Sequence, residues 1–443
     1  MLSWILSTIL YLATIAAGLF LDFGVVAKTD VRSRAKHIKW KRAYLVWLYV
    51  FLCFGYMTGA DWRNYEPVYL YGDYILHFLT EPASWFVFSY FPKVIPDFFL
   101  FMGIVKCLYL FSVYKLVSTV TDKWASVLAL LIPLKLGFML IQNPLRFMMA
   151  LIFINFALVY QYKYLSETGS RSRKMVLLIM VFTIISILFH TSCVVYLLLI
   201  PLGFLAPKLK KVNPWVLYGI YLFFVFLTSD LTLINSLKRG AIETVQQYME
   251  MSDYANYELE EATGGIRNPI QILFVLIVLI SRDKVCAAFK NGPIVYGYTL
   301  YYFFMSRLTV LIPTGFRLSL PFNIFFVIFI IYMLEARLRL SRLSLEYKRA
   351  GIVQPQPVRP APSRKRSRYR YMHFPVRVCA QLMIVYTLLS FSKKMWTSID
   401  FIPYSNSIPY LVVGHKPFEY RSQYNMDAYH ARTGKYFEGR DDR

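Results

Sequence analysis

The stretch WASVLALLIPLKLGFMLIQNPLRFMMALIFINFALVY, residues 124–160, consists of two apolar runs that meet at a short polar junction. Each run approaches the length of about twenty residues that an α-helix needs to cross a bilayer. Arg146 stands at the junction, and a charge at bilayer depth costs about 3 kcal/mol or more unless it has an anionic partner or a watery cavity. The stretch therefore predicts two membrane spans and raises the question of what the arginine meets.

Similar apolar runs recur along the chain, in which 57% of the 443 residues are hydrophobic. We predict an all-α polytopic membrane protein with about twelve transmembrane helices. Their expected ranges are 2–20, 43–58, 97–119, 124–141, 145–161, 175–190, 192–206, 214–229, 268–281, 293–312, 316–334 and 376–396. The first run lacks a basic leader and a small-residue cleavage site, so we expect it to be a retained helix.

The net charge of +24 is distributed unevenly among the loops. The strongly basic segments are 28–42, 162–174, 207–211, 281–284 and 335–375. The loops 59–96 and 230–267 instead carry more acidic than basic residues. Because basic loops stay in the cytoplasm, we predict a bundle over 1–396 with these two loops outside and 335–375 as a cytoplasmic linker. The tail 397–443 and both termini are then outside.

Three further features limit the partners of the chain. The basic linker suits anionic membrane lipids, and without a folded recognition module it does not indicate a nucleic-acid partner. The aromatic rings and acids of the loop 59–96 suit the faces and hydroxyl groups of sugars. The five cysteines are odd in number and show no zinc or redox spacing. We therefore expect no disulfide framework, and no tight ligand cluster suggests a metal or a cofactor.

Polar side chains recur where spans end on the predicted outer side. They are Asp61, Arg63, Tyr65, Glu81, Asn143, Arg146, His190, Arg307 and Arg317. Guanidinium groups bind phosphate oxygens in a bidentate way and stay charged when partly desolvated. The set therefore predicts a site for a membrane-embedded anion, a lipid phosphate or pyrophosphate.

Arg146 is expected in the first turn of its helix, because Pro144 suits a first helical turn. The exposed N–H groups and the positive end of the helix dipole favour an anion there. The sequence thus predicts that Arg146 meets a phosphate. Structural alternatives stay open: Arg146 could extend to lipid head groups, Asp61 or His190 could cap or hydrogen-bond a helix, and Glu81 could mark a helix start.

Several short motifs occur in a fixed order between about Tyr44 and Tyr404. They are Gly59-x-Asp61-Trp62-x-x-Tyr65, Glu81-Pro82 with Trp85-Phe86, Asn143-x-x-Arg146 with Ala150, Phe189-His190-x-Ser192, a late arginine at Arg307 or Arg317, and Ile402-Pro403-Tyr404. This ordered set resembles the EpsG family of bacterial exopolysaccharide proteins, which belongs with the Wzy-type polysaccharide polymerases. One departure is Phe147, where the family pattern has a glutamine after the arginine.

The resemblance implies a membrane glycosyltransferase of the GT-C type at the outer face of the bacterial inner (plasma) membrane. Such enzymes polymerise polyprenyl-pyrophosphate-linked oligosaccharide repeat units into exopolysaccharide, capsule or O-antigen. The transfer is expected to invert the anomeric carbon and to need neither a metal nor a nucleotide sugar. A chain-length regulator and a flippase are candidate partners.

Within that chemistry, positioned arginines stabilise the pyrophosphate as it leaves, and a base accepts the proton of the acceptor hydroxyl. We assign the first role to Arg146 and then Arg317, and the second to Asp61 or His190, with Glu81 as third choice. Substrate binding is assigned to Arg63, Tyr65, Glu81, Asn143, Arg307 and Arg317. The alternatives are an O-antigen ligase, an acyltransferase with His190 as base, a flippase or transporter of the same lipid-linked sugars, and a non-catalytic scaffold.

Overall fold

A computed structural model describes most of the chain, and it is helical almost throughout. The described residues are 2–24, 31–59, 61–72, 81–166, 172–228, 269–308, 319–349, 375–397 and 404–433. Within these ranges the strand-like pairing consists of one isolated antiparallel bridge between Gly55 and Asn406. The all-α prediction is thus confirmed for the part of the chain that the structure describes.

Four helical segments are long and apolar enough to cross a membrane. They are Leu2–Gly24, Phe98–Val120, Leu145–Ser166 and Val376–Trp396. Shorter apolar helices cover Trp124–Leu134, Thr191–Gly203, Pro214–Leu227 and Leu320–Ala336. Each predicted span overlaps a helix, but the count of twelve stays a prediction. Fewer long apolar helices are found among the described residues than the twelve predicted spans, partly because some apolar runs are interrupted. The run 124–141 is interrupted at Ile132–Leu136, where a π-helical turn contains Pro133.

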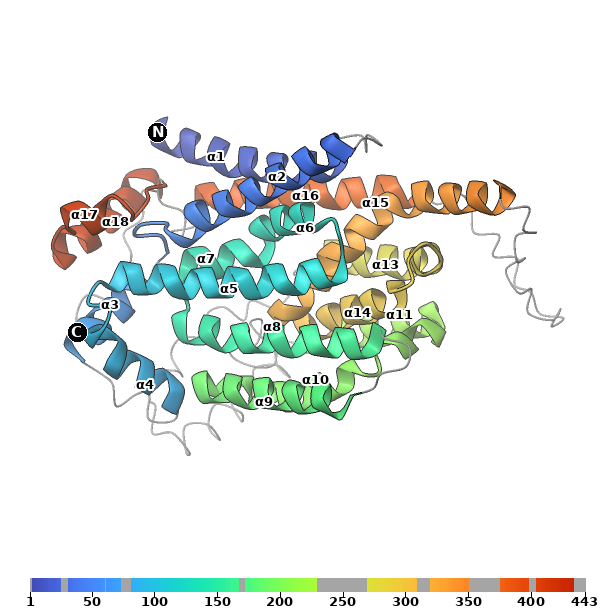
Figure 1. The fold of residues 1–443 in the computed structure, drawn as a ribbon, viewed down its shortest axis with the longest axis horizontal. Helices are drawn as coiled ribbons and strands as arrows, with labels where there is room; N and C mark the ends of the chain where they lie inside the picture. The colour runs from blue at the N-terminus through green and yellow to red at the C-terminus, as the bar shows by residue number, and fades with distance from the viewer. Residues whose placement is uncertain are drawn as a thin grey trace. The chain divides into compact units, whose positions relative to one another are not determined.

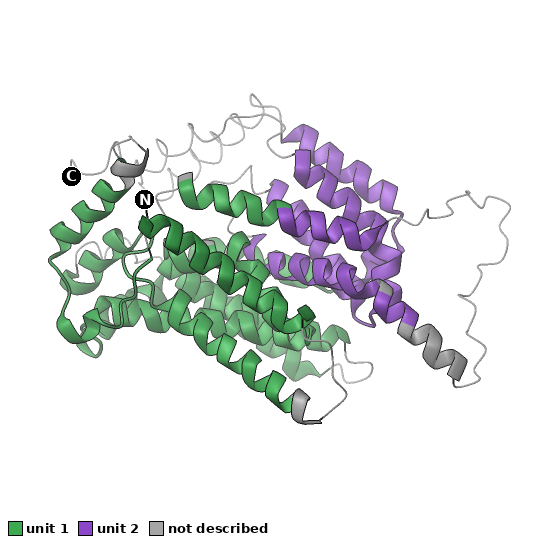
Figure 2. Cartoon of the chain, turned by 90° about the horizontal axis from the view of Figure 1, so that it is seen from above, with its two compact units in different colours: residues 1–204, 386–443 green, residues 205–385 purple. Residues whose placement is uncertain are grey.

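The chain divides into two compact units, residues 1–204 with 386–443 and residues 205–385 (Figure 2). This grouping differs from the predicted bundle over 1–396 with a separate tail 397–443. The tail belongs to the first unit because residues 404–433 form hydrogen bonds and ion pairs with residues near 50–66 and 97.

The first unit is built around α5, α8 and α9, which pack side by side (Figure 1). Its helices are α1 (Leu2–Leu19), α2 (Val31–Leu48), α3 (Trp62–Tyr71), α4 (Pro82–Tyr90), α5 (Phe98–Val120), α6 (Trp124–Leu131), α7 (Gly137–Gln142), α8 (Leu145–Ser166), α9 (Arg173–Phe189), α10 (Tyr196–Gly203), α17 (Tyr410–Val413) and α18 (Phe418–Thr433), with the later part of α16 (Val376–Thr397). The predicted outer loop 59–96 thus contains α3 and α4. A buried hydrogen bond of 2.9 Å from Asn155 to Ser112 joins α8 to α5.

The second unit contains α11 (Pro214–Leu227), α13 (Pro269–Ala288), α14 (Gly292–Leu308), α15 (Leu320–Arg349) and the start of α16. Gly297 lets α14 pack against the turn at Ala206, since a Cβ at this position would lie 2.1 Å from the Ala206 carbonyl oxygen. The predicted linker 335–375 begins as helix, because α15 continues to Arg349. The predicted outer loop 230–267 lies outside the described residues.

A buried aspartate fixes the end of the first unit that lies opposite the starts of α5 and α8. Asp22 forms an ion pair of 2.8 Å with Lys41 and accepts a hydrogen bond of 2.7 Å from the backbone N–H of Ser126. Lys123 donates to the Asp22 carbonyl oxygen at 2.9 Å. The Asp22 side chain is 1% exposed, so its charge depends on these partners.

We expect Asp22→Ala to lower the free energy of unfolding by about 3 kcal/mol, because it leaves the buried Lys41 without its counterion. The matched control is Asp283→Ala, since the Asp283 carboxylate is 47% exposed and pairs with Arg282 at the surface. That control should cost less than about 1 kcal/mol. Denaturant unfolding in detergent measures both changes, and equal losses would contradict the assignment.

Candidate functional site

One buried carboxylate joins three helices of the first unit. Glu81 Oε2 accepts a hydrogen bond of 2.7 Å from Arg146 Nη1, and Glu81 Oε1 lies 2.6 Å from His190 Nδ1. The backbone N–H of Thr191 also donates to Glu81 Oε1, at 3.1 Å. The Glu81 side chain is 3% exposed. Glu81, Arg146 and His190, hereafter the Glu81 cluster, connect the starts of α4 and α8 with the end of α9.

The local sequence explains why Glu81 is available for these contacts. Pro82 occupies the first turn of α4, so Glu81 precedes the helix in a non-helical conformation, with φ −128° and ψ 73°. Within the described segment 81–90, its side chain makes no hydrogen bond to the first turn of α4. Ser84 then donates to the Phe189 carbonyl oxygen at 2.7 Å and holds α4 against the end of α9. The carboxylate is therefore used across helices rather than as a cap.

The turn before Arg146 is held by Asn143. Asn143 ends α7 with φ 63°, a left-handed conformation that asparagine tolerates better than most residues. Its side-chain N–H donates to the Thr58 carbonyl oxygen at 2.5 Å. Pro144 accepts from the Met148 N–H at 2.8 Å, and α8 begins at Leu145. Arg146 therefore lies in the first turn of α8, as the sequence predicted.

The partner of Arg146 differs from the sequence-based expectation of a phosphate. Its guanidinium pairs with Glu81 and lies close enough to the Tyr65 side chain to interact with it electrostatically. The Arg146 side chain is 23% exposed, so part of it remains accessible to a ligand. The sequence-based interpretation overlooked this pairing because Glu81 and Arg146 are 65 residues apart. Glu81 balances the charge of Arg146, so the attraction for an anion is weaker than a lone arginine would exert.

The surroundings of Glu81 keep it ionised. Burial alone would raise the pKa of this carboxyl, but the hydrogen bond and charge of His190, the charge of Arg146 and the Thr191 N–H together lower it below its ordinary value. An ionised carboxylate only accepts hydrogen bonds, so His190 Nδ1 must donate the proton between them. In the neutral imidazole, Nε2 then carries the lone pair. Phe147 packs edge-on against the His190 ring, with 5.4 Å between the ring centroids.

Three other predicted site residues, Asp61, Arg63 and Tyr65, lie on α3 or directly before it. Tyr65 contacts Arg146, and Asp61 precedes it by one helical turn, which places both on one face of α3. Within the segment 61–72, the Asp61 side chain does not hydrogen-bond to the first turn of α3, so the capping alternative is not supported. Arg63 instead forms a long hydrogen bond of 3.4 Å to Ser422 Oγ.

Of the two late arginines, one lies in the second unit and the other outside the described residues, so their assignment to substrate binding stays a prediction. Arg307 is buried in the second unit, where its Nε donates to the Tyr221 hydroxyl at 3.2 Å. Arg317 lies outside the described residues. Among the residues that are described, no group of three or more His, Cys, Asp or Glu side chains could hold a metal ion. Thr191, which the sequence-based assignment omitted, follows His190 directly in the Phe-His-x-Ser motif.

Comparisons with known proteins agree with the motif-based resemblance. A family model described as the EpsG family matches residues 42–343, about two thirds of the chain. No curated protein and no solved structure matches the chain, so the GT-C-like architecture stays a prediction. The matched range includes all three members of the Glu81 cluster and ends before α16, α17 and α18.

The lowered pKa of Glu81 gives stability a defined pH dependence. The contribution of its ion pairs is fully present above the ordinary glutamate pKa of about 4.3 and is lost as the pH falls through the lower pKa of the folded state. We expect the melting temperature of the unchanged protein to fall more steeply from pH 5 to pH 3 than that of Glu81→Gln. Thermal unfolding in detergent measures this difference. Parallel curves for the two proteins would contradict the charged cluster.

Proposed function

This chain belongs to the EpsG family, and on that basis we propose that it polymerises polyprenyl-pyrophosphate-linked oligosaccharide repeat units into exopolysaccharide, capsule or O-antigen. The family is associated with glycosyltransferase-like polysaccharide polymerisation, and the apolar helices fit a multi-pass membrane protein. The observation that carries the proposal is the Glu81 cluster, in which one buried carboxylate orients both a histidine and a partly exposed arginine.

His190 is the preferred base in this reaction. The ionised Glu81 holds Nδ1 as a donor, so Nε2 is available to accept a proton. The acceptor hydroxyl attacks the anomeric carbon and gives its proton to Nε2. The bond between that carbon and the pyrophosphate oxygen breaks, and the electron pair leaves with the lipid pyrophosphate. One displacement of this kind inverts the anomeric carbon, and Asp61 is the second candidate for the base.

Arg146 stabilises the leaving pyrophosphate. Negative charge grows on the bridging oxygen as the bond breaks, so a donor fixed near that oxygen stabilises the transition state more than the bound substrate. The contacts with Glu81 and Tyr65 hold the guanidinium in place beforehand. The start of α8 adds N–H groups and the positive end of its dipole. These contributions offset the partial neutralisation by Glu81.

The charge distribution supports an outward-facing site. The Glu81 cluster lies where α8 begins and α9 ends, whereas Lys41 and Lys123 lie at the opposite end of the first unit around Asp22. Basic residues favour the cytoplasmic side of a membrane. The cluster would then face the periplasm or exterior, where lipid-linked repeat units are joined.

We expect Arg146→Ala to reduce polymerisation by a factor of about 100 to 1,000, since it removes one electrostatic donor to the leaving group. Lys163→Ala is the matched control, because it removes a cation from the other end of α8 and should leave the rate unchanged. The assay incubates purified protein with lipid-linked repeat units isolated from the host membranes and resolves chain lengths on a gel. Long chains at the parental rate from Arg146→Ala would refute the role. Transfer to lipid A core, rather than to another repeat unit, would indicate a ligase.

The base is identified by comparing His190→Asn with Asp61→Asn. We expect His190→Asn to lower kcat by a factor of about 100 to 10,000 and to remove the loss of rate on the acidic side of the pH profile. Asp61→Asn should keep that acidic limb. The pH dependence of kcat for the two variants measures this, and an acidic limb lost only in Asp61→Asn would reverse the assignment.

A further inference from the structure

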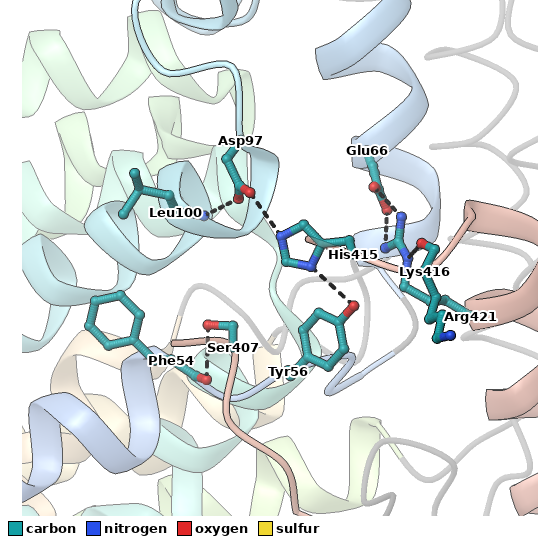
Figure 3. A network of polar contacts seen from close by, with 9 residues as sticks. All are labelled: Phe54, Tyr56, Glu66, Asp97, Leu100, Ser407, His415, Lys416 and Arg421. Atoms are coloured by element: carbon teal, nitrogen blue, oxygen red, sulfur yellow. Dashed lines mark hydrogen bonds and ion pairs between the residues drawn. The ribbon is translucent and has the colours of Figure 1, made fainter. Parts of the chain in front are cut away.

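The C-terminal tail, which follows the family-matched range, pairs with the backbone of the first unit. The N–H of Tyr56 donates to the Ser405 carbonyl oxygen at 2.9 Å, and the N–H of Ser407 donates to the Phe54 carbonyl oxygen at 2.7 Å. The Ser407 hydroxyl also donates to the Phe54 carbonyl oxygen, at 3.2 Å (Figure 3). Asn406 adds a side-chain hydrogen bond of 3.0 Å to the Val50 carbonyl oxygen. The tail therefore lies antiparallel to residues 54–56 rather than forming an independent domain.

A buried ion pair fixes α18 to α3. Arg421 donates through Nη1 and Nη2 to the two carboxylate oxygens of Glu66, at 2.7 and 2.5 Å (Figure 3). The two side chains are 5% and 6% exposed. The guanidinium also lies 5.3 Å from the ring centroid of Trp62 and 5.2 Å from that of Phe99. A bidentate pair withdrawn from water fixes an orientation strongly, because either charge alone would be costly to bury.

A second polar contact fixes the tail to the start of α5. His415 Nε2 lies 2.8 Å from Asp97 Oδ2, and His415 Nδ1 lies 3.1 Å from the Tyr56 hydroxyl (Figure 3). Asp97 also caps α5 by accepting from the Leu100 N–H at 2.8 Å. The tail thus contacts both α3 and α5 at the end of the first unit that carries the Glu81 cluster.

Residues 57 and 58 are held from two sides. The side-chain N–H of Asn425 donates to the Met57 carbonyl oxygen at 3.3 Å, and that of Asn143 donates to the next carbonyl oxygen, of Thr58, at 2.5 Å. Met57 has φ 52°, a left-handed conformation that is unfavourable for its side chain. This turn leads into α3, whose residue Tyr65 contacts Arg146. The tail and the Glu81 cluster are therefore linked through one short segment.

We propose that Arg421 is a positioning residue, which holds α3 so that Tyr65 orients Arg146 in the Glu81 cluster. His415 and Asn425 act with it, and the three residues form a tail clamp. The proposal rests on the proposed function, because the clamp acts on catalysis through Arg146. A clamp that merely stabilised the fold would change the amount of folded protein without any energetic coupling between Arg421 and Tyr65.

The test compares Arg421→Ala, Tyr65→Phe and the double variant in the full-length protein. We expect Arg421→Ala to lower kcat by roughly tenfold to a hundredfold with little change in KM, and to speed hydrogen exchange of residues 62–71. The double variant should be no slower than the slower single variant, because both changes disturb the same contact. Gln423→Ala is the matched control, since Gln423 is exposed on α18 and bonds to Asp427 of the same helix. It should change neither readout.

Two results would overturn the positioning role. One is faster exchange of α3 in Arg421→Ala with an unchanged kcat, and the other is a double variant whose loss equals the product of the single losses. If Arg421→Ala does not fold, Arg421→Lys replaces it, since lysine keeps the charge but loses the bidentate geometry. We expect Arg421→Lys to lower kcat less than Arg421→Ala would, and to cause no further fall when Tyr65→Phe is already present. A further fall in that double variant would overturn the positioning role.

The exchange data also separate this proposal from the proposed function. Should the unchanged protein fail to join lipid-linked repeat units, the polymerase proposal fails. The positioning role is then judged by hydrogen exchange alone. Faster exchange in both 62–71 and 145–150 on Arg421→Ala supports the link from clamp to cluster, and faster exchange confined to 404–433 overturns it.

Discussion

The site depends on burying one carboxylate between two basic side chains. Glu81 has lost nearly all contact with solvent, and its charge persists because Arg146 and His190 both lie within hydrogen-bond distance. This constraint fixes three helices at once, since the partners come from the starts of α4 and α8 and the end of α9. It also bears on the proposed chemistry, because an ionised acceptor at Nδ1 leaves the lone pair of the neutral imidazole on Nε2, where the proposed base needs it.

The C-terminal tail, although it lies outside the Glu81 cluster, is connected to it by hydrogen bonds. Consecutive carbonyl groups at Met57 and Thr58 are held by Asn425 of the tail and by Asn143 beside Arg146. Met57 keeps its left-handed conformation because hydrogen bonds hold both its own carbonyl group and the next one. Packing of the C-terminal tail and orientation of Arg146 thus belong to one hydrogen-bond network. A change that loosens the tail should therefore also loosen the position of Arg146, and the reverse should hold.

Much of the fold and part of the site could be predicted from the sequence. Apolar runs located the helices, and Asn143-Pro144 located the turn before Arg146. Charge alternation among the loops predicted that Glu81, Arg146 and His190 gather at one end of the bundle, and the structure brings these three side chains together. Which charges pair could not be predicted, because Glu66 and Arg421 are 355 residues apart and nothing local specifies their contact. The same holds for Arg63, which was assigned to substrate but contacts Ser422 of the tail.

The tautomer of His190 reports directly on whether the ionised Glu81 orients the imidazole. It is measured from the nitrogen chemical shifts of ¹⁵N-histidine-labelled protein at pH 8, and the signals are assigned with His190→Asn. We expect a proton on Nδ1 and none on Nε2, with Glu81→Gln weakening that preference. A proton on Nε2 in the unchanged protein, or shifts that do not respond to Glu81→Gln, would contradict this expectation.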